Sequence, residues 1–282
     1  MKRSFYALFV LLYISLAVSA EEYKQCVTQE DRDIFNRYAA FIKDKGQTTD
    51  DIVLSTASFF LDVPYVAATL EKEPEGLVVN LRELDCTTFV ESVFALSKTV
   101  KDGNLTFKAF CNNLKGFRYR NGIIDGYTSR LHYTTDWIYN NSQTGLVKDV
   151  TKSIGGDTLP INLFFMSRNA DKYKVLNGNA ELIEKMKEIE QSVNAHSYFY
   201  IPKEKLTQLQ KGIKNGDMIC FVTSIPGLDV SHVGIAKWVS GKLTFVHASS
   251  TQMKVVVQEG TLDEYIQSVS KNTGIIVVRP QF

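Results

Sequence analysis

The sequence predicts an α+β fold, in which helices come first and a small antiparallel sheet follows. Apolar residues with helical spacing dominate up to about residue 197. From residue 198 onward, short apolar β patterns alternate with turn residues. The 282 residues and 44% hydrophobic content allow a sizeable core. We therefore expect one domain over residues 21–282, with a helical part at 21–197 and a sheet part at 198–282.

The first part contains four segments with helical patterns. Residues 23–62 are amphipathic, residues 86–100 are apolar and end at a Lys-Asp-Gly-Asn turn, and residues 105–114 form a shorter helix. Residues 77–81 have an extended pattern. A loop-rich section with several tyrosines follows, and residues 179–195, rich in Glu and Lys, predict a surface helix.

The second part contains five short segments with β patterns. These segments are residues 218–222, 232–239, 242–248, 255–257 and 275–278. The second and third are separated only by Ser-Gly, which favours a β-hairpin with a two-residue loop. The order of the segments predicts an antiparallel sheet.

The first 20 residues, MKRSFYALFVLLYISLAVSA, have the pattern of a secretory signal peptide. Lys2 and Arg3 form a basic start, and small residues precede the expected cleavage after Ala20. The alternative is an uncleaved anchor, but the apolar run is short for a bilayer span. Cleavage removes two positive charges from a formal net charge of +1, which leaves −1. We expect an exported protein without a membrane anchor.

The charges and the cysteines argue against some partners. Lys and Arg are scattered without a long basic block, so nucleic-acid binding is not expected. The cysteines are Cys26, Cys86, Cys111 and Cys220, and none has the CxxC spacing of a zinc site. We expect no metal and no cofactor. If one cysteine is catalytic, the other three allow at most one disulfide, and the sequence leaves its pairing open.

Cys86 lies in the stretch LDCTTFVESVFAL, at the expected start of a helix. Asp85 is a good N-cap residue, although it could also meet a substrate amine. A thiol in the first turn can have a lowered pKa, because unpaired N–H groups and the helix dipole favour the thiolate. The same N–H groups can hold an oxyanion. The alternatives are a small buried side chain or half of a disulfide, and the helix alone does not decide between them.

Two histidines of the expected hairpin could supply a base. The chain has four histidines, His132, His196, His232 and His247. With a two-residue loop, Gly234 lies opposite His247, and His232 and His247 share one face in diagonal positions. A three-residue loop would separate the two rings. A thiol, a base histidine and a polar residue that orients it are the components of a thiol acyl-transfer site.

Several motifs in the same order make the chain resemble the DUF1460 family. They are LDCTTFVE, RNGIIDGYTSRLHYTTDW, INLFFMS, GLDVSHVGIA and HASS, and together they span nearly all of the mature chain. This family is a branch of the NlpC/P60 papain-like cysteine hydrolases. The resemblance implies a bacterial, periplasmic cell-wall amidase that cleaves between N-acetylmuramic acid and L-alanine. It also implies a papain-like fold and a catalytic triad at Cys86, His232 and His247.

Other residues near these motifs could contact a muropeptide substrate. Aromatic faces suit a sugar ring, and an arginine suits a carboxylate. The candidates are Tyr127, Arg130, His132, Tyr133 and Asp229. Alternatively, aromatic anchors and an arginine–acid pair pin this loop to the protein, His132 is structural, and Asp229 shapes the site or ends a turn.

Three classes of function remain open. The first is an amidase acting as a monomer on soluble peptidoglycan fragments, with a γ-D-glutamyl–diamino-acid endopeptidase as the nearest competing activity. The second is a periplasmic protein that binds muropeptides without cleaving them. The third is a structural envelope protein with Cys86 in a disulfide.

Overall fold

The computed structural model describes residues 27–282, so the expected signal peptide and Cys26 lie outside the described residues. The helical segment expected at residues 23–62 forms two helices, α2 (Gln29–Ile42) and α3 (Thr49–Phe59). The intervening residues include Gly46, and the Thr48 hydroxyl caps the second helix by accepting the backbone N–H of Asp51. The N-terminal part is therefore a helix pair.

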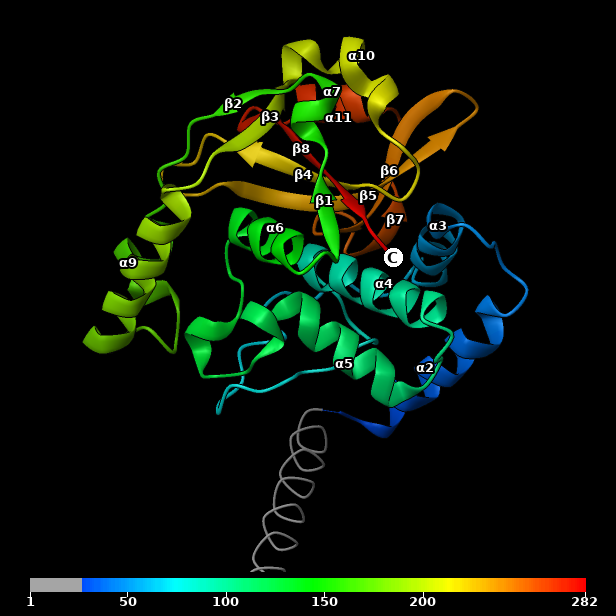
Figure 1. Ribbon diagram of the computed structural model, residues 1–282, viewed down its shortest axis with the longest axis horizontal. Helices are drawn as coiled ribbons and strands as arrows, with labels where there is room; N and C mark the ends of the chain where they lie inside the picture. Colours follow the sequence, from blue (N-terminus) through cyan, green and yellow to red (C-terminus); the bar gives the residue numbers. More distant parts are fainter. Residues whose placement is uncertain (1–26) are drawn as a thin grey trace, which may run out of the picture.

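Three further helices form a layer beside this pair (Figure 1). They are α4 (Cys86–Lys101), α5 (Phe107–Arg118) and α6 (Thr134–Gln143). Helix α4 lies at the centre of the layer, and nearly every side chain from Thr88 to Ser97 is buried. A central helix of this kind is fixed by packing on all sides, which holds its first residue in one position.

The sheet is antiparallel and has the strand order β2-β3-β8-β4-β5-β6-β7, with β1 also paired to β8. Its strands are β1 (Val147–Asp149), β2 (Asp157–Leu159), β3 (Tyr198–Pro202), β4 (Met218–Thr223), β5 (Val230–Val239), β6 (Lys242–Ser249), β7 (Lys254–Val257) and β8 (Asn272–Pro280). The five segments expected from β patterns are all strands. Two short strands from before residue 198, β1 and β2, also join the sheet. The sheet therefore includes residues from the part that was expected to be helical. The α+β class is confirmed.

Each face of the sheet packs against its own helices (Figure 1). One face packs on α4 through residues such as Val233, Ile235 and Val246. The other face, which includes Phe221 and Phe245, is covered by α7 (Thr151–Ile154), α10 (Leu206–Leu209) and α11 (Leu262–Ser268). Two separate apolar cores therefore hold the sheet between helical layers.

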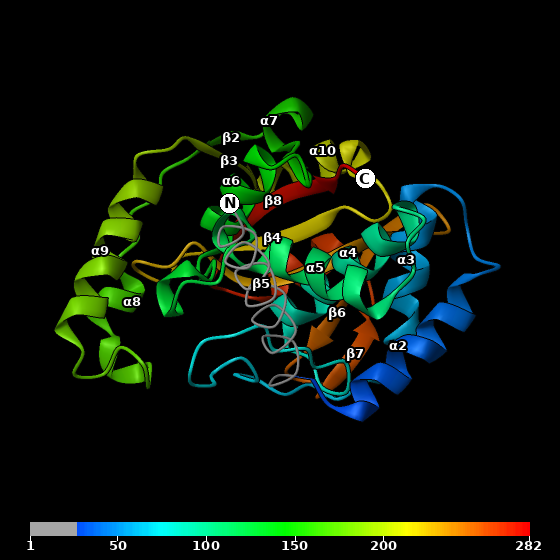
Figure 2. The same ribbon diagram turned by 60° about the horizontal axis from the view of Figure 1, so that its bottom comes forward.

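The remaining helices lie at one side of the molecule. Figure 2 shows α8 (Phe165–Arg168) beside α9 (Ala180–Asn194), the surface helix expected at residues 179–195. Residues 77–81, where a short extended segment was expected, lie outside the helices and strands. Within residues 27–282, no helix has the length and apolar character needed to cross a membrane.

Candidate active site

Cys86 is the first residue of α4, as the sequence predicts. The Asp85 carboxylate accepts the backbone N–H of Thr88 at 2.8 Å, and the Thr88 hydroxyl accepts the N–H of Asp85 at 2.9 Å. This reciprocal capping box satisfies N–H groups that have no partner within the helix. Asp85 therefore has the capping role, and the start of α4 is fixed immediately before the thiol.

The Cys86 thiol is half-buried and lies against β5. Backbone hydrogen bonds from Val233 and Thr87 reach the sulfur, and so does the Thr87 side chain. Burial, and secondly the charge of Asp85, raise the pKa of the thiol to about 11, although those hydrogen bonds act in the opposite direction. The expectation of a lowered thiol pKa is therefore wrong, because desolvation outweighs the effect of the helix start.

The two histidines meet as the hairpin register predicts. Ser240 and Gly241 form the two-residue loop, both with positive φ, and Val239 pairs with Lys242. The Nε2 atom of His232 lies 2.7 Å from Nδ1 of His247. The two rings are nearly perpendicular, so one imidazole can hold the other in a single orientation.

Two backbone features shape the strand that carries His232. The β4–β5 register shifts beside His232, because Phe221 pairs with His232 while Val222 pairs with Val230. Such a β-bulge bends the strand and re-aims neighbouring side chains. Gly234 supplies the second feature, since a Cβ there would lie 2.7 Å from the Phe245 ring and 3.2 Å from the Cβ of His247. A side chain at this position would therefore clash with the Phe245 ring and crowd His247.

Gln258 fixes the direction of the hydrogen bonds between the rings. Its Nε2 donates to the carbonyl of Glu259 at 2.8 Å, so its Oε1 is the atom that faces Nε2 of His247, at 3.2 Å. Nε2 of His247 must then carry the proton, and Nδ1 of His247 accepts from Nε2–H of His232. This tautomer, inferred from the network, leaves Nδ1 of His232 unprotonated and available as a base.

Both rings are neutral at pH 7. Burial, and secondly the nearby His247, lower the pKa of His232 to about 3. Burial also lowers the pKa of His247 to about 4, while the hydrogen bond to Gln258 opposes that shift. Because the thiol pKa is about 11, Cys86 and His232 are a neutral thiol and a neutral imidazole in the resting state.

A cavity of about 480 Å³ opens beside the histidine pair. It is lined by Ser231, His232, His247, Ser249, Ser250, Thr251, Gln252, Gln258, Tyr265, Ser268, Val269 and Asn272. Two tyrosines are near the thiol: the charge of Cys86 raises the pKa of both Tyr65 and Tyr265, after burial as the larger cause. Tyr65 forms a bridge with Leu84, just before α4.

Arg130 and the aromatic residues near it lie in an internal cluster. Arg130 is 7% exposed and forms ion pairs with Glu71 at 2.9 Å and Glu75 at 3.3 Å. The Tyr127 ring packs against both the Arg130 guanidinium and His132. Nε2 of His132 binds the carbonyl of Tyr127 at 2.8 Å, and burial lowers the pKa of His132 to about 3. The contacts match the alternative of a pinned loop, and substrate contact stays a prediction.

Tyr133 and Asp229 also use their polar atoms inside the protein. The Tyr133 hydroxyl donates to Glu190 at 2.7 Å. Asp229 accepts the backbone N–H and the hydroxyl of Thr135, at 2.7 and 2.8 Å. Asp229 thus ties the β4–β5 loop to the start of α6, next to the site. Direct contact of these two residues with substrate likewise stays a prediction.

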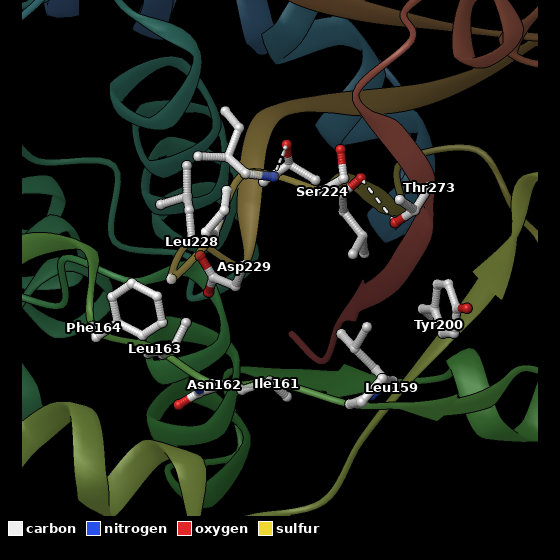
Figure 3. Close-up of a pocket in the computed structure, with 16 residues that line it drawn as sticks. Leu159, Ile161, Asn162, Leu163, Phe164, Tyr200, Ser224, Leu228, Asp229 and Thr273 are labelled. Carbon is white, nitrogen blue, oxygen red and sulfur yellow. Dashed lines mark hydrogen bonds between the residues drawn. The ribbon is translucent and has the colours of Figure 1, made fainter.

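A second cavity, of about 440 Å³, is lined by this loop and by the segment after β2. Figure 3 shows Leu163 and Phe164 of the segment after β2 facing Leu228 and Asp229 of the β4–β5 loop. Its lining is mainly apolar, and the single carboxylate, Asp229, is already bound by Thr135. This cavity therefore offers shape and apolar surface rather than catalytic groups.

The described cysteines are not paired, and Cys111 and Cys220 are buried. Among residues 27–282, no group of three or more His, Cys, Asp or Glu is placed to hold a metal ion. No motif or spacing in the sequence singles out Gln258, Tyr65 or Val233. Gln258 lies just beyond β7, and only the pairing of β6 with β7 brings it to His247.

Comparison with known proteins points to one family. A family model described as N-acetylmuramoyl-L-alanine amidase-like matches residues 55–275. The crystal structure of an N-acetylmuramoyl-L-alanine amidase from Bacteroides uniformis is 46% identical, with 83% of this chain and 99% of that chain covered and a TM-score of 0.80. A search of curated proteins found no match.

Two other solved structures are similar. One is a Bacteroides fragilis protein provisionally named a xylanase, at 42% identity, with 80% of this chain and 99% of that chain covered and a TM-score of 0.77. The other is a Legionella pneumophila protein of family model DUF1460, at 24% identity, with 90% and 95% covered and a TM-score of 0.67. The similarity to the Legionella protein shows that the two chains share a fold.

Proposed function

Because the chain belongs to the N-acetylmuramoyl-L-alanine amidase-like family, we propose that it is a cell-wall amidase. Its substrate is the amide between N-acetylmuramic acid and L-alanine in peptidoglycan fragments. The fold is papain-like, of the NlpC/P60 type, and the reaction passes through a thiol acyl-enzyme. The protein acts after export, in the periplasm, as the pattern of residues 1–20 suggests.

One observation carries the proposal. The Cys86 thiol sits at a capped helix start and is hydrogen-bonded to the backbone of Val233, the residue that follows His232 in β5. One ring nitrogen of His232 is held by His247 at 2.7 Å. A nucleophile, a base and a group that orients the base are the minimum for thiol acyl transfer. Gln258 completes the orientation by fixing the tautomer of His247.

The first half of the reaction forms the acyl-enzyme. Nδ1 of His232 takes the thiol proton as the sulfur attacks the lactyl carbonyl carbon, so the S–C bond forms and the carbonyl π electrons move to oxygen. The backbone N–H of Cys86 and the Tyr65 hydroxyl stabilise this oxyanion. The oxyanion then collapses, the C–N bond breaks, and the imidazolium of His232 gives its proton to the alanine nitrogen.

The second half returns the enzyme to its resting state. His232 takes a proton from water, and the hydroxide attacks the thioester carbonyl. The C–S bond breaks, and the sulfur recovers its proton from His232. The products are the free lactyl carboxylate on the sugar and a stem peptide with L-alanine at its amino end.

The similar structure named a xylanase suggests a glycosidase as a second candidate. Glycosidases use two carboxyl groups about 5–10 Å apart around the scissile bond. None of the described residues that line the His232 cavity carries a carboxylate. The site therefore favours acyl transfer over glycosidic cleavage. An endopeptidase of the stem peptide would use the same groups, so the products must distinguish it.

Product analysis tests the function directly. The purified protein is incubated with N-acetylmuramoyl-L-alanyl-D-isoglutamine, and the products are identified by mass spectrometry. We expect N-acetylmuramic acid and free L-alanyl-D-isoglutamine, with turnover abolished in Cys86→Ala and His232→Ala. Cys111→Ala and His196→Asn are the matched controls and should retain activity. A cut only within longer stem peptides would make the protein an endopeptidase, and full activity of Cys86→Ala would refute the triad.

A further inference from the structure

A small cavity of about 20 Å³ lies where α4, α6 and the sheet meet. Its wall on α4 consists of Thr87, Val90 and Glu91, which share one face of the helix because they are three or four residues apart. None of its lining residues lines the cavity beside His232, so the two cavities are distinct. The rest of its lining is Leu131, His132, Thr134, Trp137, Met218 and Val233.

Trp137 places an unpaired hydrogen-bond donor at this cavity. The residue is 3% exposed, and its Nε1 has no hydrogen-bond partner among residues 27–282. Its ring stacks on Phe117, with centroids 5.9 Å apart and an interplanar angle of 14°, and lies beside Phe94, so packing fixes its direction. An unpaired buried N–H is costly, and buried tryptophans usually donate to a partner. The indole therefore calls for an acceptor inside the cavity.

Two side chains of the same lining can only accept a further hydrogen bond. Burial lowers the pKa of His132 to about 3, so its ring is neutral at pH 7. Its Nε2 lies 2.8 Å from the carbonyl of Tyr127, so Nε2 carries the proton and Nδ1 is an acceptor. Glu91 is 2% exposed and its Oε2 accepts the Nε–H of Arg118 at 2.6 Å, which leaves Oε1 as a further acceptor. A molecule among these groups must accept from Trp137 and also donate.

The volume of the cavity decides which molecule can do this. A water needs about 10–15 Å³, so a cavity of about 20 Å³ holds one water and no larger ligand. Water has lone pairs for the indole N–H and two protons for the acceptors, and about three hydrogen bonds are usual for a buried water. An ammonium ion is of similar size, but it has no lone pair with which to accept from Trp137.

We propose that a single internal water occupies this cavity, accepts the hydrogen bond of Trp137 Nε1–H and donates to His132 and Glu91. Thr87 and Val233 line the same cavity and also hydrogen-bond to the sulfur of Cys86. The water therefore lies next to the residues that hold the thiol and ties them to α6. The inference does not rest on the proposed function, because it uses no property of a substrate.

The two tryptophans of the chain provide an internal control for an NMR test. Nε1 of Trp238 donates to the carbonyl of Ile213 at 2.9 Å, so that indole needs no water. In the ¹⁵N-labelled protein, Trp137→Phe and Trp238→Phe assign the two indole N–H signals. We expect the Trp137 N–H to show cross-peaks to water with opposite signs in NOESY and ROESY spectra, which indicates a long-lived water nearby. The Trp238 N–H should show no such pair of cross-peaks.

Two substitutions in the lining separate the internal water from other sources of these cross-peaks. Val90→Ile adds a methylene group to the cavity wall and should expel the water, so the Trp137 cross-peaks disappear while its indole signal remains. Thr134→Val removes a hydroxyl proton that could relay exchange with bulk water, and the cross-peaks should remain. Thermal melting shows whether each variant is folded. A crystal structure of the wild-type protein needs no variant, and water density should lie about 2.7–3.2 Å from Nε1 of Trp137.

Several results would overturn the internal water. Cross-peaks of equal sign would show exchange with bulk water, and their loss in folded Thr134→Val would make the hydroxyl their source. Absent cross-peaks, their persistence in folded Val90→Ile, or a crystal structure without density in the cavity would also refute the site. The proposed amidase activity is judged separately, by product analysis, so either proposal can fail while the other stands.

Discussion

A negative charge introduced at residue 258 should change the pH range in which the histidine pair is active. Gln258→Glu places a carboxylate about where Oε1 now lies, 3.2 Å from Nε2 of His247. Opposite charges about 4 Å apart interact by about 4 kcal/mol at an effective dielectric constant of about 20. Gln258 is half-buried, so solvent screening reduces this value to about 2–3 kcal/mol.

That energy corresponds to an increase of about 2 units in the pKa of His247, because one unit is about 1.4 kcal/mol. The pKa would rise from about 4 to about 6, since roughly 2 units are added. Protonated His247 cannot accept the hydrogen bond from His232, so activity is lost as the pH falls through this value. The acid limb of kcat/KM should therefore move from near pH 4 to near pH 6.

The assay is kcat/KM on a muramoyl-dipeptide between pH 4 and pH 9. At pH 5, Gln258→Glu should be about tenfold less active than the wild type, and at pH 8 the two should agree within about twofold, as the 2-unit shift requires. Gln258→Leu removes the acceptor without adding charge. It should lose about 1 kcal/mol, or about fivefold in kcat, at every pH.

Gln252→Glu is the matched control, because Gln252 lines the same cavity without contacting His247. If Gln252→Glu shifts the acid limb as far as Gln258→Glu, the effect is general electrostatics and the hydrogen-bond relay is not its cause. If neither variant shifts it, the neutral relay is refuted.

The neutral resting thiol, the helix cap and the tight turn of the site each give a further prediction. Alkylation of Cys86 by iodoacetamide should increase steadily between pH 8 and about 10, because burial raises the thiol pKa to about 11; a plateau already at pH 6 would indicate a preformed ion pair. Asp85→Asn keeps the cap but removes the charge, so it should speed this alkylation with little change in Tm. Asp85→Ala loses the cap and should destabilise the protein by about 1 kcal/mol in chemical denaturation, and equal stability of the two variants would contradict the capping role. Gly234→Val should destabilise the protein by about 1–3 kcal/mol or more and reduce kcat, because the new side chain overlaps the Phe245 ring and displaces His247; unchanged stability would refute the close packing.

The site was predictable from the sequence where local rules determine it. Asp85 before an apolar run predicts a capped helix, and that cap fixes Cys86 regardless of the rest of the fold. The Ser-Gly loop fixes the hairpin register, and a period of two residues then places His232 and His247 on one face. The role of the three as a triad remains a proposal, but their placement needed only short-range geometry.

Long-range packing determines what the sequence could not provide. Gln258 reaches His247 because β7 pairs with β6, and no spacing rule links the two residues. Strands β1 and β2 have three residues each, too few for a visible alternation. The thiol pKa was expected to fall because the helix start is local, whereas the burial that raises it comes from β5 and the helices around α4.

Burial of the site also determines how the proposed reaction must begin. A thiol with a pKa of about 11 and an imidazole with a pKa of about 3 do not exchange a proton spontaneously, so a preformed thiolate is a minor species. The proton must move while the S–C bond forms, because negative charge then passes to the carbonyl oxygen, where N–H and O–H donors stabilise it. Such coupling requires the carbonyl to be held against the sulfur while Nδ1 of His232 is already oriented. The relay through His247 and Gln258 provides the orientation of the base before substrate arrives.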